Sequence, residues 1–243
     1  MKSRFTILLS ILALTFAALA CQFGFSTANI ADAWMSKDAA GEQRSTTFLQ
    51  DELFYAQVDV RNVPEGTQLK AVWTAVSAAG EAPNTEINTT ESSLDEDTLV
   101  NFELSNSNLW PAGNYKVEIY LNDKLEKTLD FEVLAPAISD AWLSSDDGGD
   151  GRVAAFPDDA VLYAQADLTN HYEGALVRAV WSVVSVEGVE PGFEIQRSEY
   201  ATPKSENRLT FSLTNNGPWP VGVYKVDIYL EEALAKTLEF EIR

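Results

Sequence analysis

The chain has 243 residues, 37 acidic and 17 basic side chains, and a formal net charge of -20 at pH 7. This balance argues against a nucleic-acid-binding protein, because phosphate binding needs clustered Lys and Arg, and against a protein that lies flat on anionic lipid headgroups. Solubility is the simplest explanation of the charge, with cationic ligands or a saline habitat as alternatives.

Residues 1–20 have the pattern of a signal peptide. Lys2 and Arg4 provide a basic start, and an apolar or small-residue run extends from residue 5 to residue 20. This run is short for a membrane-spanning helix, which needs about 20 apolar residues. We therefore expect the segment to be removed rather than folded.

Cys21 is the only cysteine, and it directly follows Ala18-Leu19-Ala20. This segment resembles the lipobox of bacterial lipoproteins, whose cysteine thiol takes a diacylglycerol and becomes the mature N-terminus. The resemblance implies a lipoprotein acylated at Cys21, with palmitate-type chains, and held in the cell envelope at the outer membrane or the outer face of the plasma membrane. A buried thiol or an intermolecular bridge is the alternative. Residues 21–29 then form a lipidated tether.

The remaining chain contains two copies of one unit, at 30–133 and 138–243. All six tryptophans occupy matched positions in the two copies: Trp34 with Trp142, Trp73 with Trp181, and Trp110 with Trp219. A period of this length is a whole small domain rather than a solenoid repeat. The linker, 134–137, contains a proline and spans at most about 13 Å, so we expect a restricted angle between the domains.

Within each unit the apolar residues alternate with a period of two, which is typical of half-buried strands. In the first unit this pattern and the turn residues predict strands near 30–36, 46–49, 53–60, 69–78, 85–90 and 99–105, and a hairpin of 114–122 with 126–133. No stretch after the signal peptide has a convincing helical stripe. The fold class is therefore all-β.

These features resemble an immunoglobulin-like or fibronectin type III-like fold, which implies two tandem seven-stranded β-sandwiches. Trp73 and Trp181 stand in the strand where such sandwiches bury a tryptophan against the facing sheet. The segments 110–115 and 219–224 look like the turn before the sixth strand, and Tyr115 and Tyr224 resemble a tyrosine corner by position. Disulfide-bonded members are excluded, because there is no second cysteine.

Little in the sequence indicates an enzyme or a cofactor. His171 is the only histidine, its counterpart is Val63, and a histidine between Asn170 and Tyr172 is predicted to be a solvated turn residue. We find no phosphate loop, no zinc-type cluster and no serine in a strand-to-helix elbow. Acidic pairs that converge through folding would escape this reasoning.

One segment has a weak resemblance to a calcium loop. Asp146, Asp147 and Asp150 offer oxygen ligands within an Asp- and Gly-rich stretch, 146–151. Gly148 stands where a ligand is expected, and no Glu follows at the spacing of a helix-loop-helix site. The prediction is an acidic glycine-rich turn without a metal.

A better candidate for binding is a set of polar and aromatic residues that recur unchanged in both units: Asp32, Trp34, Tyr55 and Gln57, with Asp140, Trp142, Tyr163 and Gln165. Alternation places Tyr55 and Gln57 opposite the buried Phe54 and Ala56, so we expect a solvent-facing patch suited to sugar stacking or peptide contact. The alternative is an aromatic cross-strand pair that only shields the sheet, or a Trp34 side chain that packs under the edge of the sandwich.

Two functional hypotheses follow. The first is a membrane-anchored, non-catalytic extracytoplasmic interaction or adhesion module that binds a protein or glycan partner of the cell surface or envelope. The second is a structural accessory subunit of a cell-envelope complex.

Overall fold

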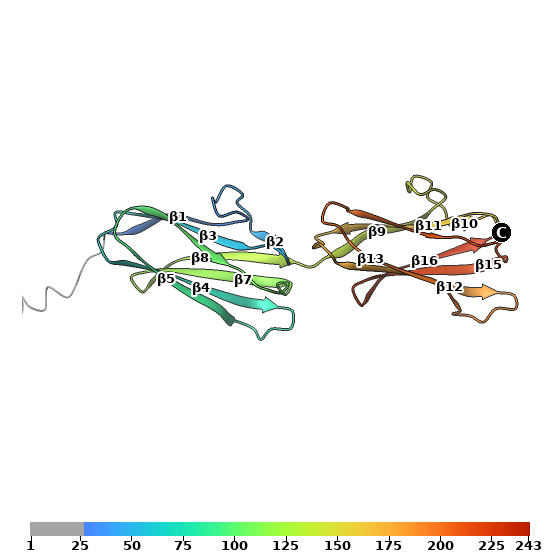
Figure 1. Cartoon of the computed structure of the whole chain (residues 1–243). Helices are drawn as coiled ribbons and strands as arrows, with labels where there is room; N and C mark the ends of the chain where they lie inside the picture. The colour runs from blue at the N-terminus through green and yellow to red at the C-terminus, as the bar shows by residue number, and fades with distance from the viewer. Residues whose placement is uncertain (1–26) are drawn as a thin grey trace, which may run out of the picture.

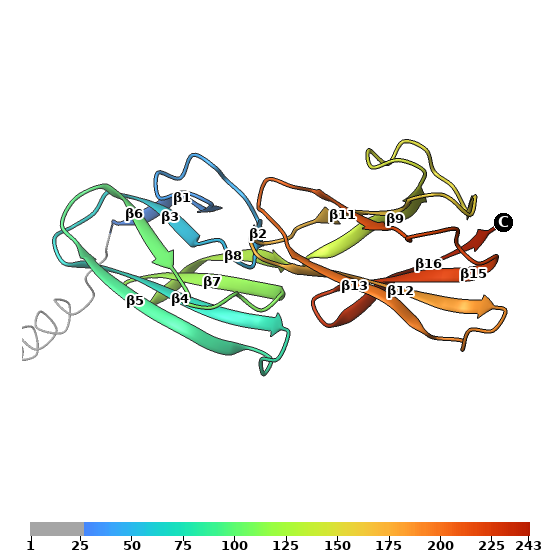
Figure 2. The ribbon, with the colours of Figure 1, turned by 45° about the vertical axis from the view of Figure 1, so that its right-hand side comes forward.

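A computed structural model describes residues 27–243, and every regular element in this part of the chain is a β-strand. The expected signal peptide and Cys21 lie outside the described residues. No helix within residues 27–243 has the length and apolar character needed to cross a membrane. Figures 1 and 2 show two sandwiches arranged end to end, with the C-terminus at the end remote from the first sandwich.

The first unit contains two facing sheets. Its strands are β1 (Asn29–Ser36), β2 (Thr47–Leu49), β3 (Phe54–Arg61), β4 (Thr67–Ala78), β5 (Thr85–Leu94), β6 (Thr98–Leu104), β7 (Gly113–Leu121) and β8 (Lys124–Leu134). The three-stranded sheet has the order β1-β3-β6, and the five-stranded sheet has the order β2-β8-β7-β4-β5. This arrangement is an immunoglobulin-like sandwich.

The second unit repeats the arrangement. Its strands are β9 (Ala137–Ser144), β10 (Ala155–Phe156), β11 (Leu162–Thr169), β12 (Leu176–Val186), β13 (Glu194–Ala201), β14 (Arg208–Leu213), β15 (Gly222–Leu230) and β16 (Ala233–Ile242). The sheet orders are β14-β11-β9 and β10-β16-β15-β12-β13.

Each unit has eight strands in the structure, whereas the resemblance implied seven; the extra strand of the first unit, β2, lies within the predicted range 46–49. The reason is that the opening strand is split between the sheets. β1 pairs antiparallel with β3 in the small sheet, and after a connection the three-residue β2 pairs parallel with the end of β8 in the large sheet. The all-β prediction is confirmed, and the predicted strand positions differ from the observed ones by a few residues at most.

The two units have separate hydrophobic cores. Trp73 in β4 and Trp181 in β12 are fully buried, as predicted, and each packs edge-on against a phenylalanine of the last strand. In β7 the side chains of Tyr115, Val117 and Ile119 are buried on one face. Period-two alternation therefore places the same face of each strand in the core.

The predicted tyrosine corner is present in both units. The Tyr115 hydroxyl donates a hydrogen bond to the Pro111 carbonyl at 2.6 Å, and the Tyr224 hydroxyl donates to the Pro220 carbonyl at 2.7 Å. Gly113 ends this turn, where a Cβ atom would lie 2.2 Å from the Ser77 carbonyl oxygen. Only glycine lets the turn approach β4 so closely.

The junction between the sandwiches is short and carries an ion pair. Only Ala135 and Pro136 lie between β8 and β9, and Lys204 Nζ of the second unit lies 3.0 Å from Asp51 Oδ2 of the first. His171 contacts the residue before Lys204: it is 5% exposed, and its Nε2 lies 3.2 Å from the Pro203 carbonyl oxygen. The prediction of a solvated histidine is wrong, because the loop between β13 and β14 covers the ring.

Candidate functional site

The residues predicted to form a binding patch are brought together, but a loop covers much of them. Trp34 pairs with Gln57 across β1 and β3, and Trp142 pairs with Gln165 across β9 and β11. Both glutamines are completely buried. The expected solvent-facing position is therefore wrong for them, because alternation along a strand does not reveal a loop that folds back over the outer face.

In the first unit the covering segment is the β1–β2 connection, residues 37–46. Trp34 Nε1 donates a hydrogen bond to the Gly41 carbonyl at 3.0 Å, and Gln57 Nε2 donates to the Ala39 carbonyl at 3.1 Å. Gly41 has a φ of 76°, and a Cβ atom there would lie 2.9 Å from Gln57 Cγ. Glycine is required at this position both by the left-handed backbone and by the close approach to the glutamine.

The second unit builds the same arrangement with more hydrogen bonds. Trp142 Nε1 donates to the Gly149 carbonyl at 2.9 Å, and Gln165 Nε2 donates to Ser144 Oγ at 3.1 Å and to the Asp147 carbonyl at 3.2 Å. Thr210 completes the set by donating to Gln165 Oε1 at 2.6 Å. In the first unit Gln57 Oε1 has no hydrogen-bond partner.

Arginine side chains cover the tryptophan rings. The Arg44 guanidinium lies 3.9 Å from the ring centre of Trp34, and its Nη2 is 2.9 Å from Asp32 Oδ2. Arg152 lies 4.1 Å from the ring centre of Trp142 and pairs with Asp140 at 2.8 Å. These cation–π contacts occupy ring surface that a sugar would need for stacking.

The two tyrosines of the predicted patch also contribute mainly to packing. Tyr55 is 8% exposed, and Tyr163 is partly buried opposite Ser144. Burial, followed by the neighbouring Glu103 carboxylate, raises the pKa of the Tyr55 hydroxyl above its ordinary value.

The acidic stretch 146–151 is a turn held by its first carboxylate. Asp146 Oδ1 accepts a hydrogen bond from the Asp150 amide at 3.2 Å, and Oδ2 accepts from the Gly151 amide at 2.9 Å. The Gly151 amide is the main cause of a lowered pKa at Asp146, against partial desolvation. Asp147 and Asp150 belong to the same exposed loop. Within residues 27–243 no three His, Cys, Asp or Glu side chains lie close enough together to hold a metal ion.

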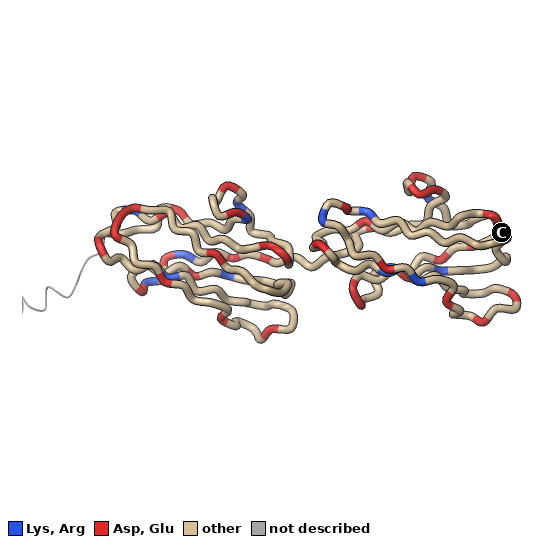
Figure 3. Tube along the Cα trace, viewed as in Figure 1, with Lys and Arg blue, Asp and Glu red and all other residues tan. Residues whose placement is uncertain are grey.

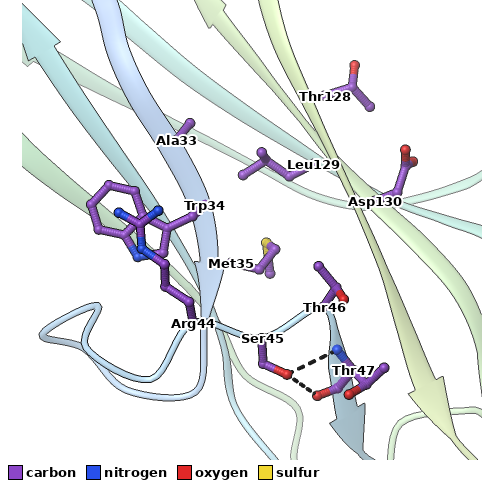
Figure 4. A pocket seen from close by; sticks show the side chains of 10 residues that line it. All are labelled: Ala33, Trp34, Met35, Arg44, Ser45, Thr46, Thr47, Thr128, Leu129 and Asp130. Carbon is purple, nitrogen blue, oxygen red and sulfur yellow. Dashed lines mark hydrogen bonds between the residues drawn. The ribbon is translucent and has the colours of Figure 1, made fainter.

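The tryptophan, glutamine, glycine and arginine that hold the loop in each unit are called the loop platform below. A groove next to the loop platform of the first unit was not predicted from the sequence. It lies at the seam of the first sandwich, between β1 of the small sheet and β8 of the large sheet (Figure 4). Its volume is about 750 Å³. Its lining combines apolar, hydroxyl and charged side chains: Ala33, Trp34, Met35, Arg44, Ser45, Thr46, Thr47, Thr128, Leu129 and Asp130. Two members, Trp34 and Arg44, come from the platform described above.

The seam of the second sandwich differs, because its groove lies over β10 and β16 and no residue of β9 lines it. Its groove of about 590 Å³ is lined by Val153, Ala154, Ala155, Val223, Glu239, Phe240, Glu241 and Arg243. Hydroxyl groups in the first seam are thus replaced by Val and Ala in the second. The three consecutive hydroxyl residues at 45–47 are the one sequence feature that distinguishes the first seam. They could not be interpreted from the sequence, because their position beside β8 depends on where the chain crosses from one sheet to the other.

No protein-family model matches the chain, and no curated protein matches it. Among solved structures the chain is similar to trypsin-activated alpha-2-macroglobulin from Escherichia coli, with 9% sequence identity and a TM-score of 0.33. The match covers 88% of this chain but 17% of that chain, so this chain spans about a sixth of the length of that protein. The fold assignment rests on the strand order, the register and the tyrosine corners.

Proposed function

We propose that this protein is a lipid-anchored, extracytoplasmic and non-catalytic recognition module, built from two tandem domains, which binds a protein partner at the seam of its first sandwich. The proposal is supported by the composition of the seam groove. Apolar side chains of Met35 and Leu129, the hydroxyls of Thr46 and Thr47, and the carboxylate of Asp130 lie along one open depression. Mixed apolar and polar surfaces of this kind suit protein contacts.

A protein partner fits better than a glycan. Sugar stacking needs an open aromatic face, whereas Arg44 lies over the ring of Trp34, and both Arg152 and Arg208 lie over the ring of Trp142. A sugar would have to displace a guanidinium that is also paired with a carboxylate.

The groove lies in the sandwich that directly follows the proposed anchor. If Cys21 carries the lipid, the first sandwich lies next to the membrane, because residues 22–28 reach about 25 Å at full extension. The partner would then be another protein of the same envelope surface. Fractionation of a Cys21→Ser variant tests the anchor: we expect it in the soluble fraction, and a variant that stays in the membrane fraction contradicts lipidation.

Binding is tested with a pair of groove-filling variants. Thr46→Trp places an indole in the first seam, and Ala154→Trp makes the matched change in the second. The full chain in mild detergent, and both variants, are applied to an array of purified envelope proteins and to a glycan array. We expect protein binding that Thr46→Trp weakens at least tenfold and Ala154→Trp leaves unchanged. Glycan binding, or protein binding indifferent to Thr46→Trp, contradicts the proposal; a stable co-purifying complex formed through the second sandwich supports an accessory subunit instead.

A further inference from the structure

The last strand of the large sheet in the first unit has a free edge along the seam groove. β2 pairs only with the final part of β8, Thr47 with Glu132 through Leu49 with Leu134. β8 has β7 on its other side, and these two are its only neighbours in the sheets formed by residues 27–243. From Lys124 to Phe131 the strand therefore has no partner on the groove side.

A hydrogen bond just before the start of β2 shows which backbone groups of β8 point into the groove. The Glu132 amide donates to the Thr46 carbonyl at 2.9 Å, so the backbone of Glu132 faces the seam. Backbone groups of alternate residues in a strand point to the same edge. Asp130 and Thr128 therefore direct their N–H and C=O groups toward the groove, and Lys116 and Glu118 are their non-hydrogen-bonded neighbours in β7.

We propose that the seam accepts an extended segment of the protein partner as an added strand beside β8, in line with β2, and that this segment alternates apolar and basic residues. This inference rests on the proposed function and specifies its partner. Added strands bind through backbone hydrogen bonds, and the alternate side chains give specificity.

The apolar half of the pattern follows from the floor of the groove. Met35 is 4% exposed, and Leu129 is a partly buried side chain packed on the core. Figure 4 shows Leu129 directed into the space between β1 and β8, with Met35 on the facing strand. Every second side chain of an added strand would point between the sheets onto these two residues.

The basic half follows from the carboxylates on the outer side. Asp130 and Glu132 are exposed, and neither forms an ion pair with a residue in the described part of the chain. Acidic residues are spread along both units (Figure 3), and the net charge is -20. A second copy of this chain paired through β8 would bring these carboxylates together, whereas a basic segment neutralises them.

The second sandwich provides a contrast that makes the inference specific. The Glu241 amide donates to the Ala154 carbonyl, so β16 also has a free edge beyond its two residues paired with β10. The groove beside β16 has no lining residue from β9, so it lacks the apolar floor between the sheets that Met35 and Leu129 provide in the first unit. We therefore expect strand addition at β8 and not at β16.

The test uses phage-displayed random dodecapeptides selected on the full chain in mild detergent. Asp130→Pro removes the N–H group that faces the groove, and Glu239→Pro removes the equivalent group of β16. Proline is tolerated on a strand edge that faces solvent, and thermal melting checks the fold of both variants. Asp130→Lys reverses the charge without changing the backbone.

We expect selected peptides with alternating apolar and basic residues, bound at least tenfold more weakly by Asp130→Pro and by Asp130→Lys and equally well by Glu239→Pro. Methylation of alternate peptide nitrogens should abolish binding. Selection of no binder, of acidic peptides, or of peptides indifferent to Asp130→Pro overturns strand addition. If envelope-protein binding is sensitive to Thr46→Trp but not to Asp130→Pro, the strand model alone fails; if no protein binds, the proposed function fails.

Discussion

The two sandwiches have the same residues where a loop is held against the small sheet, and different residues at the seam where a partner is proposed to bind. The tryptophan, glutamine, glycine and arginine of the loop platform are identical in both units: Trp34, Gln57, Gly41 and Arg44, with Trp142, Gln165, Gly149 and Arg152. At the seam, Ser45, Thr46 and Thr47 correspond to Val153, Ala154 and Ala155. Repeated residues in this chain thus maintain the fold, and the residues that differ distinguish the surfaces.

This comparison reverses the expectation drawn from the sequence. Residues that recur in two internal copies are easily interpreted as a functional set. Here the recurring tryptophan and glutamine instead stabilise the fold. Trp34 and Gln57 hold the loop 37–46 against the small sheet through Gly41 and Ala39. A site that serves one partner needs only one copy of its residues, as the first seam has.

The largest effects are expected from the two buried core tryptophans. Trp73→Ala and Trp181→Ala should each lower the free energy of unfolding of their own unit by about 3–5 kcal/mol. Calorimetry of the two variants should show one unit destabilised and the other unchanged, because the cores are separate. Loss of both transitions in either variant would contradict tandem, independently folding domains.

Phenylalanine at the same positions serves as the control. Neither Trp73 Nε1 nor Trp181 Nε1 has a hydrogen-bond partner. Trp→Phe therefore removes ring volume but breaks no hydrogen bond, and we expect a clearly smaller loss than for Trp→Ala.

Replacing the buried glutamines should destabilise the two units to different extents. Gln165→Ala removes the hydrogen bonds of Gln165 with Thr210 and the Asp147 carbonyl, and we expect a loss of about 2 kcal/mol. Gln57→Ala should cost only about 1 kcal/mol, because Gln57 Oε1 makes no hydrogen bond. Chemical denaturation measures both, and hydrogen exchange should show faster exchange in the overlying loop. Equal losses would mean that the two platforms are energetically alike.

The loop glycine is a third point of comparison. Gly149 has a φ of 81°, and a Cβ atom there would lie 3.0 Å from Gln165 Cγ. Gly149→Ala combines left-handed strain with this contact, so we expect a loss of about 1–2 kcal/mol. Gly188 has a φ of 78° with no atom within 4 Å of an added Cβ. Gly188→Ala is therefore the matched control for strain alone, and a melting temperature as low as that of Gly149→Ala would disprove the role of the close approach.

The fold was largely predictable from the sequence, because strand positions depend on local patterns. Period-two alternation in β7 and the Trp110-Pro111 turn each specify an element and its inward face without knowledge of the rest of the chain. The burial of Gln57 was not predictable from such local patterns. Its burial depends on where residues 37–46 fold, and on the crossing between sheets that splits the first strand. The seam groove depends on the same crossing, so it was missed for the same reason.

The acidic turn should make the second unit sensitive to low pH. The Gly151 and Asp150 amides lower the pKa of Asp146 below its ordinary value of 3.8. A lowered pKa in the folded state stabilises the fold above the unfolded-state pKa of about 3.9, and that contribution is lost as the pH falls through the folded-state value. Asp146→Asn should therefore melt closer to the parent chain at acid pH than at pH 7. A melting difference that is constant from pH 7 to the acid limit would contradict this linkage.

The smallest effect is expected at the junction, where the two units meet through an exposed ion pair. Lys204 is 53% exposed and Asp51 is 22% exposed in their side chains, so Lys204→Ala should cost about 0.2–1 kcal/mol at most. We expect the two-residue connection through Pro136 to restrict the angle independently of this pair. Small-angle scattering of the variant should therefore show an almost unchanged maximum dimension. A marked broadening of the distance distribution would mean that the ion pair, rather than the short linker, sets the arrangement of the two sandwiches.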